Sequence, residues 1–486
     1  MVLTGRAAVL AAAAALIVML AAPSWAGVVV TTSLLLVAIA VDVATAGPAA
    51  RLTLSRPPLT VVRAGRETGV TLEVVNTGAR TIRGRLWDDW PDSARATPVA
   101  AHRLRLPPNT KFGVTTRLSP AQRGDRVAGP VTLRLIGPLG LAGRQVRRTV
   151  PARVRALPPF RAERILVSKV KLVQHLEGRN VVNMRGQGSE FDSFREYVAG
   201  DDVRAIDWRA TARATDVLVR TWRPERNRHV LMLLDTGRSA AGRVSSRAAG
   251  TAGPGGSTPT GPVGSTAAGR DGATAANHHG GAAPGQSGRP NPAAGRPVLD
   301  GTRLDANIEA ALLLGGLAAA AGDTVDLIAY DRSVRAEVRG ASGRGVQPTL
   351  MHALSGVVPA LVDTDTAGLV RTAIRYARRR SLVVWFTSLD GALVEENLLP
   401  VLPILTARHR VLLVSVTDAE LTAAAGTRGT TAEVFTAAAA ESALAERALV
   451  RETLRRRGVE VIAADAEQLP GLLGDEYLEL KQSGAV

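Results

Sequence analysis

Five short apolar runs in the second half of the chain constrain its fold most. They cover residues 229–234, 324–330, 382–386, 410–416 and 459–463. Nearly continuous runs of this kind are typical of strands that are buried on both faces of a parallel sheet. Between them lie patterns that favour helices, at residues 304–321, 366–379, 393–406 and 432–457. The alternation predicts a doubly wound α/β domain over residues 229–480.

A segment inside this domain has a different composition. Residues 242–301 are rich in Gly, Ala, Ser, Thr and Pro and contain almost no large apolar side chain. Such a segment cannot bury enough apolar surface to offset the entropy lost on ordering. We therefore expect a disordered insertion between the first strand and the first helix of the α/β domain.

The N-terminus contains two long apolar runs, at residues 7–22 and 28–43. The turn between them is uncharged, whereas Arg6 precedes the first run and Arg51 follows the second. Each run is close to the length that spans a bilayer, and arginines flanking apolar helices favour the cytoplasmic side. These features predict a transmembrane helical hairpin in residues 1–46 of a multi-pass protein of the plasma membrane, with cytoplasmic soluble domains.

A second interpretation of the same region is a secretory signal peptide. The small-residue sequence Ser24-Trp25-Ala26 follows the first apolar run and resembles a cleavage site. Cleavage there would place the mature chain outside the cell. The second apolar run, which follows immediately, favours the hairpin.

Residues 50–158 show short alternating segments that are separated by turn signals. This spacing predicts a small antiparallel β-sandwich. Between Arg51 and Arg155 the chain has 20 basic and six acidic residues, so most of the formal net charge of +17 belongs here. Beneath a membrane, such a domain would attract anionic lipid headgroups. A basic but merely solvated surface is the alternative.

Composition also excludes several functions. The chain has no cysteine, which rules out disulfides, thiol catalysis and cysteine zinc sites. Aromatic residues make up 3% of the chain, too few for a platform that stacks nucleic-acid bases, and we expect no nucleic-acid partner. The phosphate-binding loop, the zinc-protease motif, the nucleophile elbow and the dinucleotide fingerprint are all missing from the sequence. We therefore expect a protein that is not an enzyme.

Oxygen-bearing side chains lie in the loops beside the predicted strands and helices. Asp235 ends the first strand and Ser239 lies four residues later, while Thr364 precedes a predicted helix and Asp390 follows the third strand. Loops at the carboxyl ends of strands converge in a doubly wound sheet, and carboxylate and hydroxyl oxygens suit Mg²⁺. The alternative is that these side chains only cap helices and close loops.

This pattern resembles the metal-ion-dependent adhesion site of the von Willebrand factor A domain, whose first loop reads Asp-x-Ser-x-Ser. Asp235 and Ser239 match that loop, and Thr364 and Asp390 correspond to ligands from later loops. Gly237 stands where the family has its first serine. The resemblance implies a Mg²⁺ site, and the missing hydroxyl implies that the site is weak or absent.

The segment at residues 159–228 carries a second, more specific resemblance, to the bacterial family called domain of unknown function 58. The matching residues are Glu190, Phe191, Arg195, Glu196, Tyr197, Gly200, Asp201, Asp202, Arg204, Asp207, Trp208 and Arg213. The resemblance implies a membrane protein with a von Willebrand factor A-like domain, often encoded near AAA+ ATPases of the MoxR type.

The charges of the same segment nearly cancel. Residues 185–228 contain nine arginines and eight acidic residues. Phosphate or nucleic-acid sites show uncompensated arginine, so this balance predicts mutual pairing. Tyr197 and Trp208 provide large surfaces that can pack against the sheet or a partner. We expect this segment to act as a brace, meaning that it packs against and stabilises the sheet, more than as a direct binding face.

Together these observations predict a membrane-anchored, non-enzymatic adaptor that works with a MoxR-type AAA+ ATPase. One alternative is a cell-envelope hydrolase or transferase that uses a metal held by Asp235 and Asp390. A further alternative is a module that binds anionic lipid through the basic sandwich.

Overall fold

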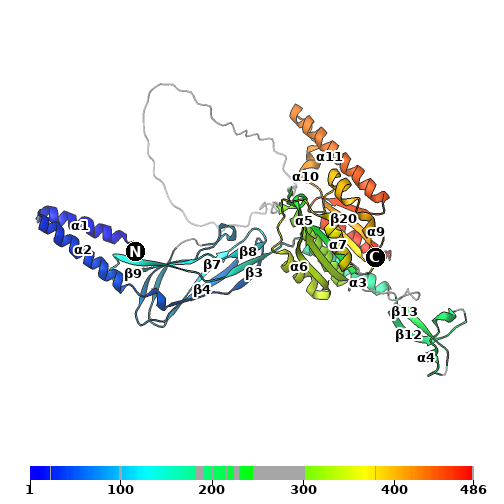
Figure 1. Ribbon diagram of the computed structural model, residues 1–486, viewed down its shortest axis with the longest axis horizontal. Helices are drawn as coiled ribbons and strands as arrows, with labels where there is room; N and C mark the ends of the chain where they lie inside the picture. Colours follow the sequence, from blue (N-terminus) through cyan, green and yellow to red (C-terminus); the bar gives the residue numbers. More distant parts are fainter. Residues whose placement is uncertain are drawn as a thin grey trace, which may run out of the picture.

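The computed structural model describes residues 1–21, 23–97, 101–180, 190–199, 201–214, 216–223, 229–244, 301–377 and 379–483. Most of the expected insertion at 242–301 lies outside the described residues. Along the chain, a helix pair leads into a β-rich domain, which is followed by a small two-stranded arm and then by an α/β domain (Figure 1). A multidomain protein of mixed α/β class is confirmed.

The N-terminal helices α1 (Gly5–Ala21) and α2 (Trp25–Thr45) lie side by side and extend from the β-rich domain (Figure 1). Ser24 begins α2, because its hydroxyl accepts a hydrogen bond from the backbone N–H of Gly27. Among the described residues, the helical stretch from Trp25 to Arg51 is long and apolar enough to cross a membrane by length and composition, whereas the apolar part of α1 is shorter.

The β-rich domain consists of one five-stranded sheet and two three-stranded sheets, with strand orders β1-β10-β9-β5-β6, β2-β4-β7 and β3-β11-β8. Leu72, Leu86 and Leu133 are fully buried between the first two sheets. The strands are β1 (Val2–Leu3), β2 (Leu52–Ser55), β3 (Leu59–Arg63), β4 (Thr68–Asn76), β5 (Ile82–Trp87), β6 (His102–Leu106), β7 (Lys111–Leu118), β8 (Gly124–Val127), β9 (Val131–Ile136), β10 (Ala142–Arg148) and β11 (Arg153–Leu157).

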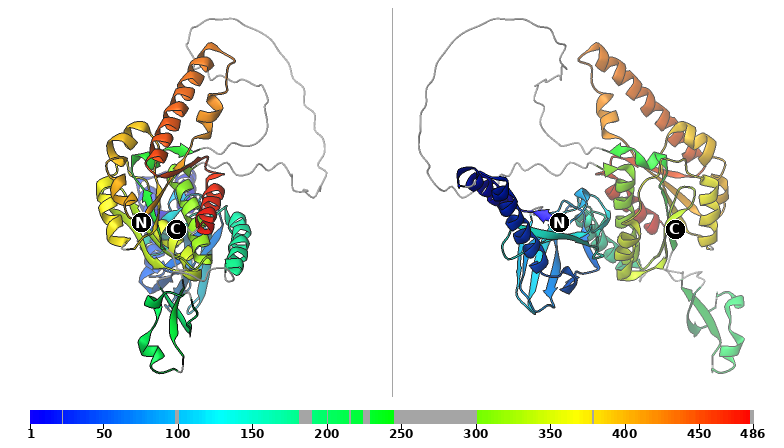
Figure 2. Two further views of the ribbon diagram at one scale, coloured as in Figure 1. Left: turned by 90° about the vertical axis from the view of Figure 1, so that its right-hand side faces the viewer. Right: turned by 60° about the vertical axis from the view of Figure 1, so that its left-hand side comes forward.

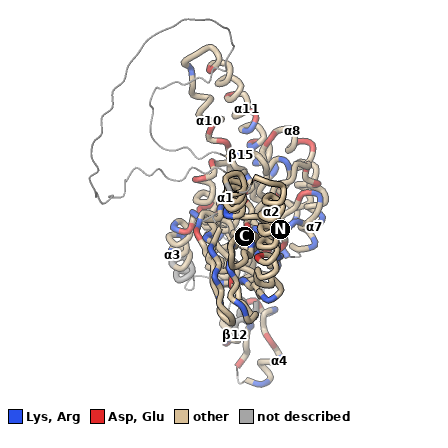
Figure 3. The backbone as a smooth tube through the Cα atoms, turned by 90° about the vertical axis from the view of Figure 1, so that its left-hand side faces the viewer, with Lys and Arg blue, Asp and Glu red and all other residues tan. Residues whose placement is uncertain are grey.

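The expectation of a purely antiparallel sandwich is wrong in one place. Strand β11 pairs with β3 in parallel and with β8 in the antiparallel sense. The connection from β3 to β11 spans most of the domain, so the chain is long enough to return in the same direction. Lys and Arg are distributed along these strands (Figure 3).

The two ends of the helix pair are both attached to the five-stranded sheet. Before α1, strand β1 pairs with β10, opposite Gly143 and Ala142. Near the end of α2, the fully buried carboxylate of Asp42 accepts backbone hydrogen bonds from Leu139 at 2.8 Å, Leu141 at 2.7 Å and Ala142 at 2.9 Å. A carboxyl group in this apolar helix is tolerated because three backbone N–H groups replace the water that would otherwise solvate it.

The α/β domain contains a six-stranded sheet of order β18-β17-β14-β19-β20-β21. Its strands are β14 (His229–Asp235), β17 (Thr324–Tyr330), β18 (Val334–Ala341), β19 (Leu382–Phe386), β20 (Arg410–Val416) and β21 (Glu460–Ala464). All neighbouring pairs are parallel except β17 with β18. The five expected strands are present, and β18 is an additional antiparallel edge strand.

Helices cover both faces of this sheet (Figure 2), so the sheet is doubly wound. One apolar core contains side chains of α5, α6 and α12, and the other contains side chains of α7, α9 and α11. The helices are α3 (Glu163–Asn180), α5 (Arg303–Ala320), α6 (Val346–Leu354), α7 (Thr366–Tyr376), α8 (Gly391–Leu393), α9 (Leu402–Thr406), α10 (Ala419–Ala424), α11 (Thr431–Arg456) and α12 (Leu469–Gln482). A π-helical turn at Val394–Leu398 interrupts the expected helix at 393–406.

Polar contacts join the sandwich and its linker to helix α5. The buried guanidinium of Arg123 donates to Asp305 at 2.5 Å. Glu309 accepts the backbone N–H groups of Arg161 at 2.7 Å and Ala162 at 2.9 Å. Burial raises the pKa of Glu309, although both N–H groups and the charge of Arg161 act in the opposite direction. These contacts hold the sandwich and its linker against helix α5 of the α/β domain.

The family-signature segment forms a small arm with its own two-stranded sheet, β12 (Glu190–Glu196) and β13 (Leu218–Arg223). A 3-10 turn (Val203–Ala205) and the short helix α4 (Trp208–Thr211) lie between the strands. The arm stands apart from the α/β domain (Figures 1 and 2).

Candidate functional site

The carboxylate of Asp235 is the centre of a polar cluster at the carboxyl end of β14. Its Oδ2 accepts hydrogen bonds from the hydroxyls of Ser239 at 2.8 Å and Thr387 at 3.2 Å. Its Oδ1 accepts from the backbone N–H of Gly237 at 2.8 Å and from the hydroxyl of Thr364. The residue is only 6% exposed. Three loops therefore converge on one buried carboxylate.

Sheet order explains this convergence. Asp235 ends β14, and Thr387 directly follows β19, the parallel neighbour of β14. Backbone hydrogen bonds hold the loop at residues 360–364, which carries Thr364, beside the Asp235 loop. Ala360 N donates to Thr236 O at 2.7 Å, and Arg238 N donates to Val362 O at 2.8 Å. The carboxyl ends of central strands form one edge, as expected for a doubly wound sheet.

Asp390 lies in the same cleft but has different partners. Its Oδ2 accepts from the hydroxyl of Ser388 at 2.7 Å. The guanidinium groups of Arg303 and Arg447 approach its two oxygens at 3.8 and 3.6 Å. The cleft has a volume of about 280 Å³ and is lined by all four of the predicted ligands, Asp235, Ser239, Thr364 and Asp390.

The arrangement at Asp390 bears on metal binding. The hydroxyls of Ser239 and Thr364 and the carboxylate of Asp235 are hard oxygen donors of the kind that Mg²⁺ prefers. A cation that also used Asp390 would have to displace Arg303 and Arg447, since both guanidiniums are directed at that carboxylate. In the part of the chain that the structure describes, no three His, Asp or Glu side chains form a metal-binding group.

Gly237 is required by the packing of this cluster. A β-carbon at this position would lie 2.7 Å from the carbonyl oxygen of Val362 and even closer to the hydroxyl of Thr364. The space that a serine side chain would need is therefore filled by Thr364, which donates to Asp235 from there.

Gly237→Ser is expected to destabilise the α/β domain by about 1–3 kcal/mol, because the 362–364 loop must move. Restoring the adhesion-site serine should not create a strong Mg²⁺ site, since Thr364 would be displaced. Thermal unfolding with and without MgCl₂ tests both points. Gly471→Ala is the control, because open space surrounds Gly471 within α12 and alanine favours helix. A large Mg²⁺-dependent rise in Tm for Gly237→Ser would contradict the expectation.

Two ion pairs lie within the signature arm. Arg195 donates to Asp201 at 2.6 Å, and Arg220 donates to Asp207 at 2.6 Å. Asp207 also caps α4 through the N–H groups of Arg209 and Ala210. The pKa of Asp207 is lowered, mainly by the N–H of Ala210 and then by Arg220. The expected mutual pairing is observed for these residues.

The expected brace against the sheet is not observed. Trp208 is 66% exposed, and Val198 and Val203 are similarly exposed at 62% and 61%. The ion pairs stabilise the arm internally, and these apolar side chains do not pack against the sheet. Glu196, Tyr197, Asp202, Arg204 and Arg213 also lie on the arm, whereas Gly200 and the side chains of Glu190 and Phe191 lie outside the described residues.

Three further polar side chains of the cleft were not among the predicted site residues. Thr387 could have been predicted, because it is a hydroxyl residue directly after a central strand, as Asp235 is. Arg303 and Arg447 have no such signal. Arg303 begins helix α5 and Arg447 lies in α11, far from the strand ends in sequence, so only the fold brings them to Asp390.

Several solved structures share a local likeness with the chain. A PapD-like domain of human CEP192 is 12% identical, covering 22% of this chain and 85% of that one with a TM-score of 0.16. Native alpha-2-macroglobulin from Escherichia coli is 14% identical, covering 24% and 18% with a TM-score of 0.20. A FixG-related protein from Vibrio parahaemolyticus is 11% identical, covering 22% and 94% with a TM-score of 0.15. These low scores carry no inference.

The comparison with curated proteins gives no match. The comparison with protein families does give one. Residues 193–249 match the family described as "Protein of unknown function DUF58". The matched region contains most of the signature arm, strand β14 and the Asp235 loop. The resemblance to this family that the signature residues carry is therefore confirmed over residues 193–249.

Proposed function

We propose that this protein is a membrane-anchored, non-enzymatic adaptor whose signature arm docks a protein partner. The observation that carries the proposal is the exposure of Trp208, Val198 and Val203 on an arm that two internal ion pairs hold together. Burial of such side chains in an interface is worth about 1.5–3 kcal/mol each. Exposed apolar patches with polar rims are typical of interaction sites.

The cleft around Asp235 supports docking more than catalysis. Asp235 already accepts four hydrogen bonds, and Asp390 is held by a hydroxyl and two arginines. Both carboxylates are therefore already engaged by neighbouring side chains, which favours a structural role for them. Strand order and the converging loops support a von Willebrand factor A-like domain. Any Mg²⁺ would be held weakly by Asp235, Ser239 and Thr364.

Membrane anchoring is proposed through the helix pair. The apolar helix α2 supports a span, and the attachment of β1 and Asp42 to the sandwich supports a hairpin that stays with the folded protein. The proposed orientation places the soluble domains in the cytoplasm. A MoxR-type AAA+ ATPase is the proposed partner, as the family resemblance implies.

Co-purification with a co-expressed MoxR-type ATPase from the same organism tests the proposal. Replacing Trp208 and Val203 with serine is expected to weaken binding at least about tenfold, because the loss of two buried apolar contacts exceeds 1.4 kcal/mol. The matched control replaces the exposed Val434 and Phe435 of α11 with serine and should bind normally. Failure of the unaltered protein to bind the ATPase, with or without Mg²⁺, would contradict the proposal.

A further inference from the structure

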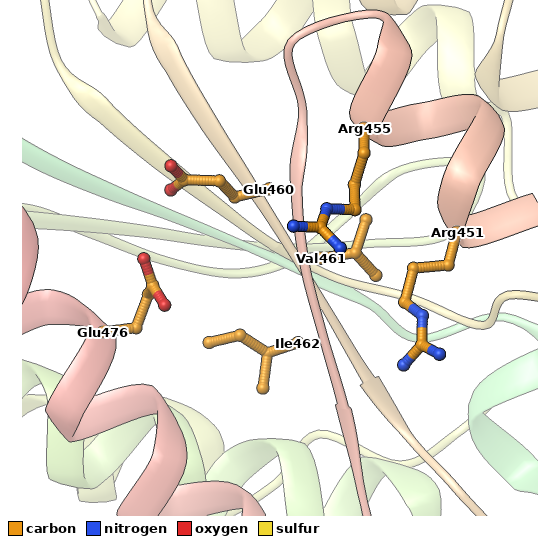
Figure 4. A pocket seen from close by; sticks show the side chains of 6 residues that line it. All are labelled: Arg451, Arg455, Glu460, Val461, Ile462 and Glu476. Atoms are coloured by element: carbon orange, nitrogen blue, oxygen red, sulfur yellow. The ribbon is translucent and has the colours of Figure 1, made fainter. Parts of the chain in front are cut away.

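The outer edge of strand β21 forms an open groove that the proposed function does not use. Strand β21 is last in the order of the sheet and pairs with β20 on one side. No strand in the described part of the chain pairs with its other side. The groove beside it has a volume of about 490 Å³ and is lined by Arg451, Arg455, Glu460, Val461, Ile462 and Glu476 (Figure 4).

The two walls of the groove carry opposite charge. Arg451 and Arg455 extend from α11 on one face of the sheet, and Glu476 extends from α12 on the other (Figure 4). Side chains of β21 alternate between these faces. Val461 packs into the core on the α11 side, and Ile462 packs into the core on the α12 side.

The charged side chains on both walls are not fully balanced by neighbouring opposite charges. Arg451 and Arg455 are exposed, and neither forms an ion pair with a residue that the structure describes. On the opposite wall, burial raises the pKa of Glu476, and the neighbouring charges of Glu460 and Glu479 raise it further. Arg410, paired with Glu460, only partly offsets this crowding of carboxylates. The walls therefore favour an anion on the α11 side and a cation on the α12 side.

We propose that the β21 edge binds an extended polypeptide segment of a partner protein as an added strand, with acidic side chains at alternate positions and basic side chains between them. An unpaired edge offers backbone hydrogen bonds to such a segment. Because side chains of a strand alternate between faces, the acidic ones would meet Arg451 and Arg455 while the basic ones meet Glu476.

The same charges exclude a second copy of this chain. A two-fold axis through paired β21 strands would run them antiparallel and keep each face of the sheet on the same side. Arg451 and Arg455 would then approach the same arginines of the other copy, and Glu476 would approach its own equivalent. Like charges that face each other across paired strands are destabilising.

The test measures binding of a fluorescent peptide of five Glu-Lys repeats to the full-length protein by anisotropy. Its control is the isomer with five Glu followed by five Lys, which has the same composition but no alternation. The alternating peptide is expected to bind on the order of tenfold tighter at low salt. It should also slow hydrogen exchange at residues 460–464, because those amides lie in the strand to which it pairs.

Charge reversal then locates the binding. The double variant Arg451→Glu, Arg455→Glu should lose the preference for the alternating peptide. The variant Arg456→Glu, Arg457→Glu has the same change in charge at the end of the same helix, outside the groove, and should keep it. Equal affinity for both peptides, or unchanged exchange at 460–464, would overturn the proposal. The proposal would also be overturned if the unaltered protein formed a dimer and the Arg451→Glu, Arg455→Glu variant did not.

The proposal does not depend on the signature arm or on the Asp235 cleft. An adaptor that failed to bind an ATPase could still bind the alternating peptide, and the reverse outcome is equally possible. The two experiments therefore fail independently.

Discussion

Asp42→Ala is expected to release the N-terminal helix pair from the sandwich. The variant leaves the N–H groups of Leu139, Leu141 and Ala142 without their acceptor. An unsatisfied buried donor costs about 1–3 kcal/mol, and the N–H groups of Leu141 and Ala142 are buried, so the attachment should weaken by roughly 2–6 kcal/mol. If α2 crosses a membrane, the sandwich would then lose its fixed position relative to that membrane.

The absence of native cysteine allows a direct measurement of this release. Leu3 of β1 pairs with Ala142 of β10, so cysteines at these two positions should form a disulfide readily. Adding Asp42→Ala should slow disulfide formation by about tenfold or more, since 1.4 kcal/mol corresponds to a factor of ten.

Thr45→Ala is the matched control for Asp42→Ala. The hydroxyl of Thr45 contacts only the helix carbonyls of Val41 and Asp42, so its removal should leave cross-linking unchanged. Equal cross-linking rates in Asp42→Ala and in the parent would show that Asp42 does not hold the helix pair.

Asp88→Ala is expected to have the second large effect, on the stability of the sandwich. The side chains of Arg56 and Asp88 are 0% and 1% exposed and are joined at 2.7 Å. Asp88 also accepts hydrogen bonds from Trp90 Nε1 at 2.9 Å and the Thr116 hydroxyl at 2.7 Å. Removing one partner of a buried ion pair costs about 3–5 kcal/mol, because the other charge stays buried without compensation.

Hydrogen exchange of the amides in β4 and β7 measures this effect locally, which is appropriate because a multidomain chain does not unfold in a single step. Arg153→Ala is the control. It removes one partner of the more exposed pair with Asp125, whose contribution is about 0–1 kcal/mol. If Asp88→Ala accelerates exchange no more than Arg153→Ala does, the buried pair is not a main source of stability.

The central strands of the α/β domain were predictable because nearly every position along them is buried. Strands β17, β19 and β20 have the expected bounds, since both faces of each are buried and every position favours an apolar residue. Strand β18 was missed because it lies at an edge of the sheet. Its sequence, VRAEVRGA, mixes charged and apolar residues, and most of it is not buried.

The candidate site was predictable only in part. Strand ends indicate which loops meet, and on that basis Asp235 and Ser239 were expected beside later loops. Thr364 was chosen through the resemblance to the adhesion site, and the structure places it beside Asp235 and Ser239. Asp390 was expected beside them as a metal ligand. Its pairing with Arg303 and Arg447 was not predictable, because those arginines come from helices that approach the site only after packing.

The sequence by itself determined the local structure of this chain. Apolar runs specified the buried strands, and the positions just after those strands specified the polar cluster at the carboxyl edge of the sheet. The balance of charges in the signature segment specified that some of them pair. The tertiary structure decided which surfaces those charges and apolar groups face. Trp208 was expected to brace the sheet and is instead exposed on an arm. Local composition specifies how a segment folds, whereas its exposure depends on which distant element packs against it, and that is a property of the whole chain.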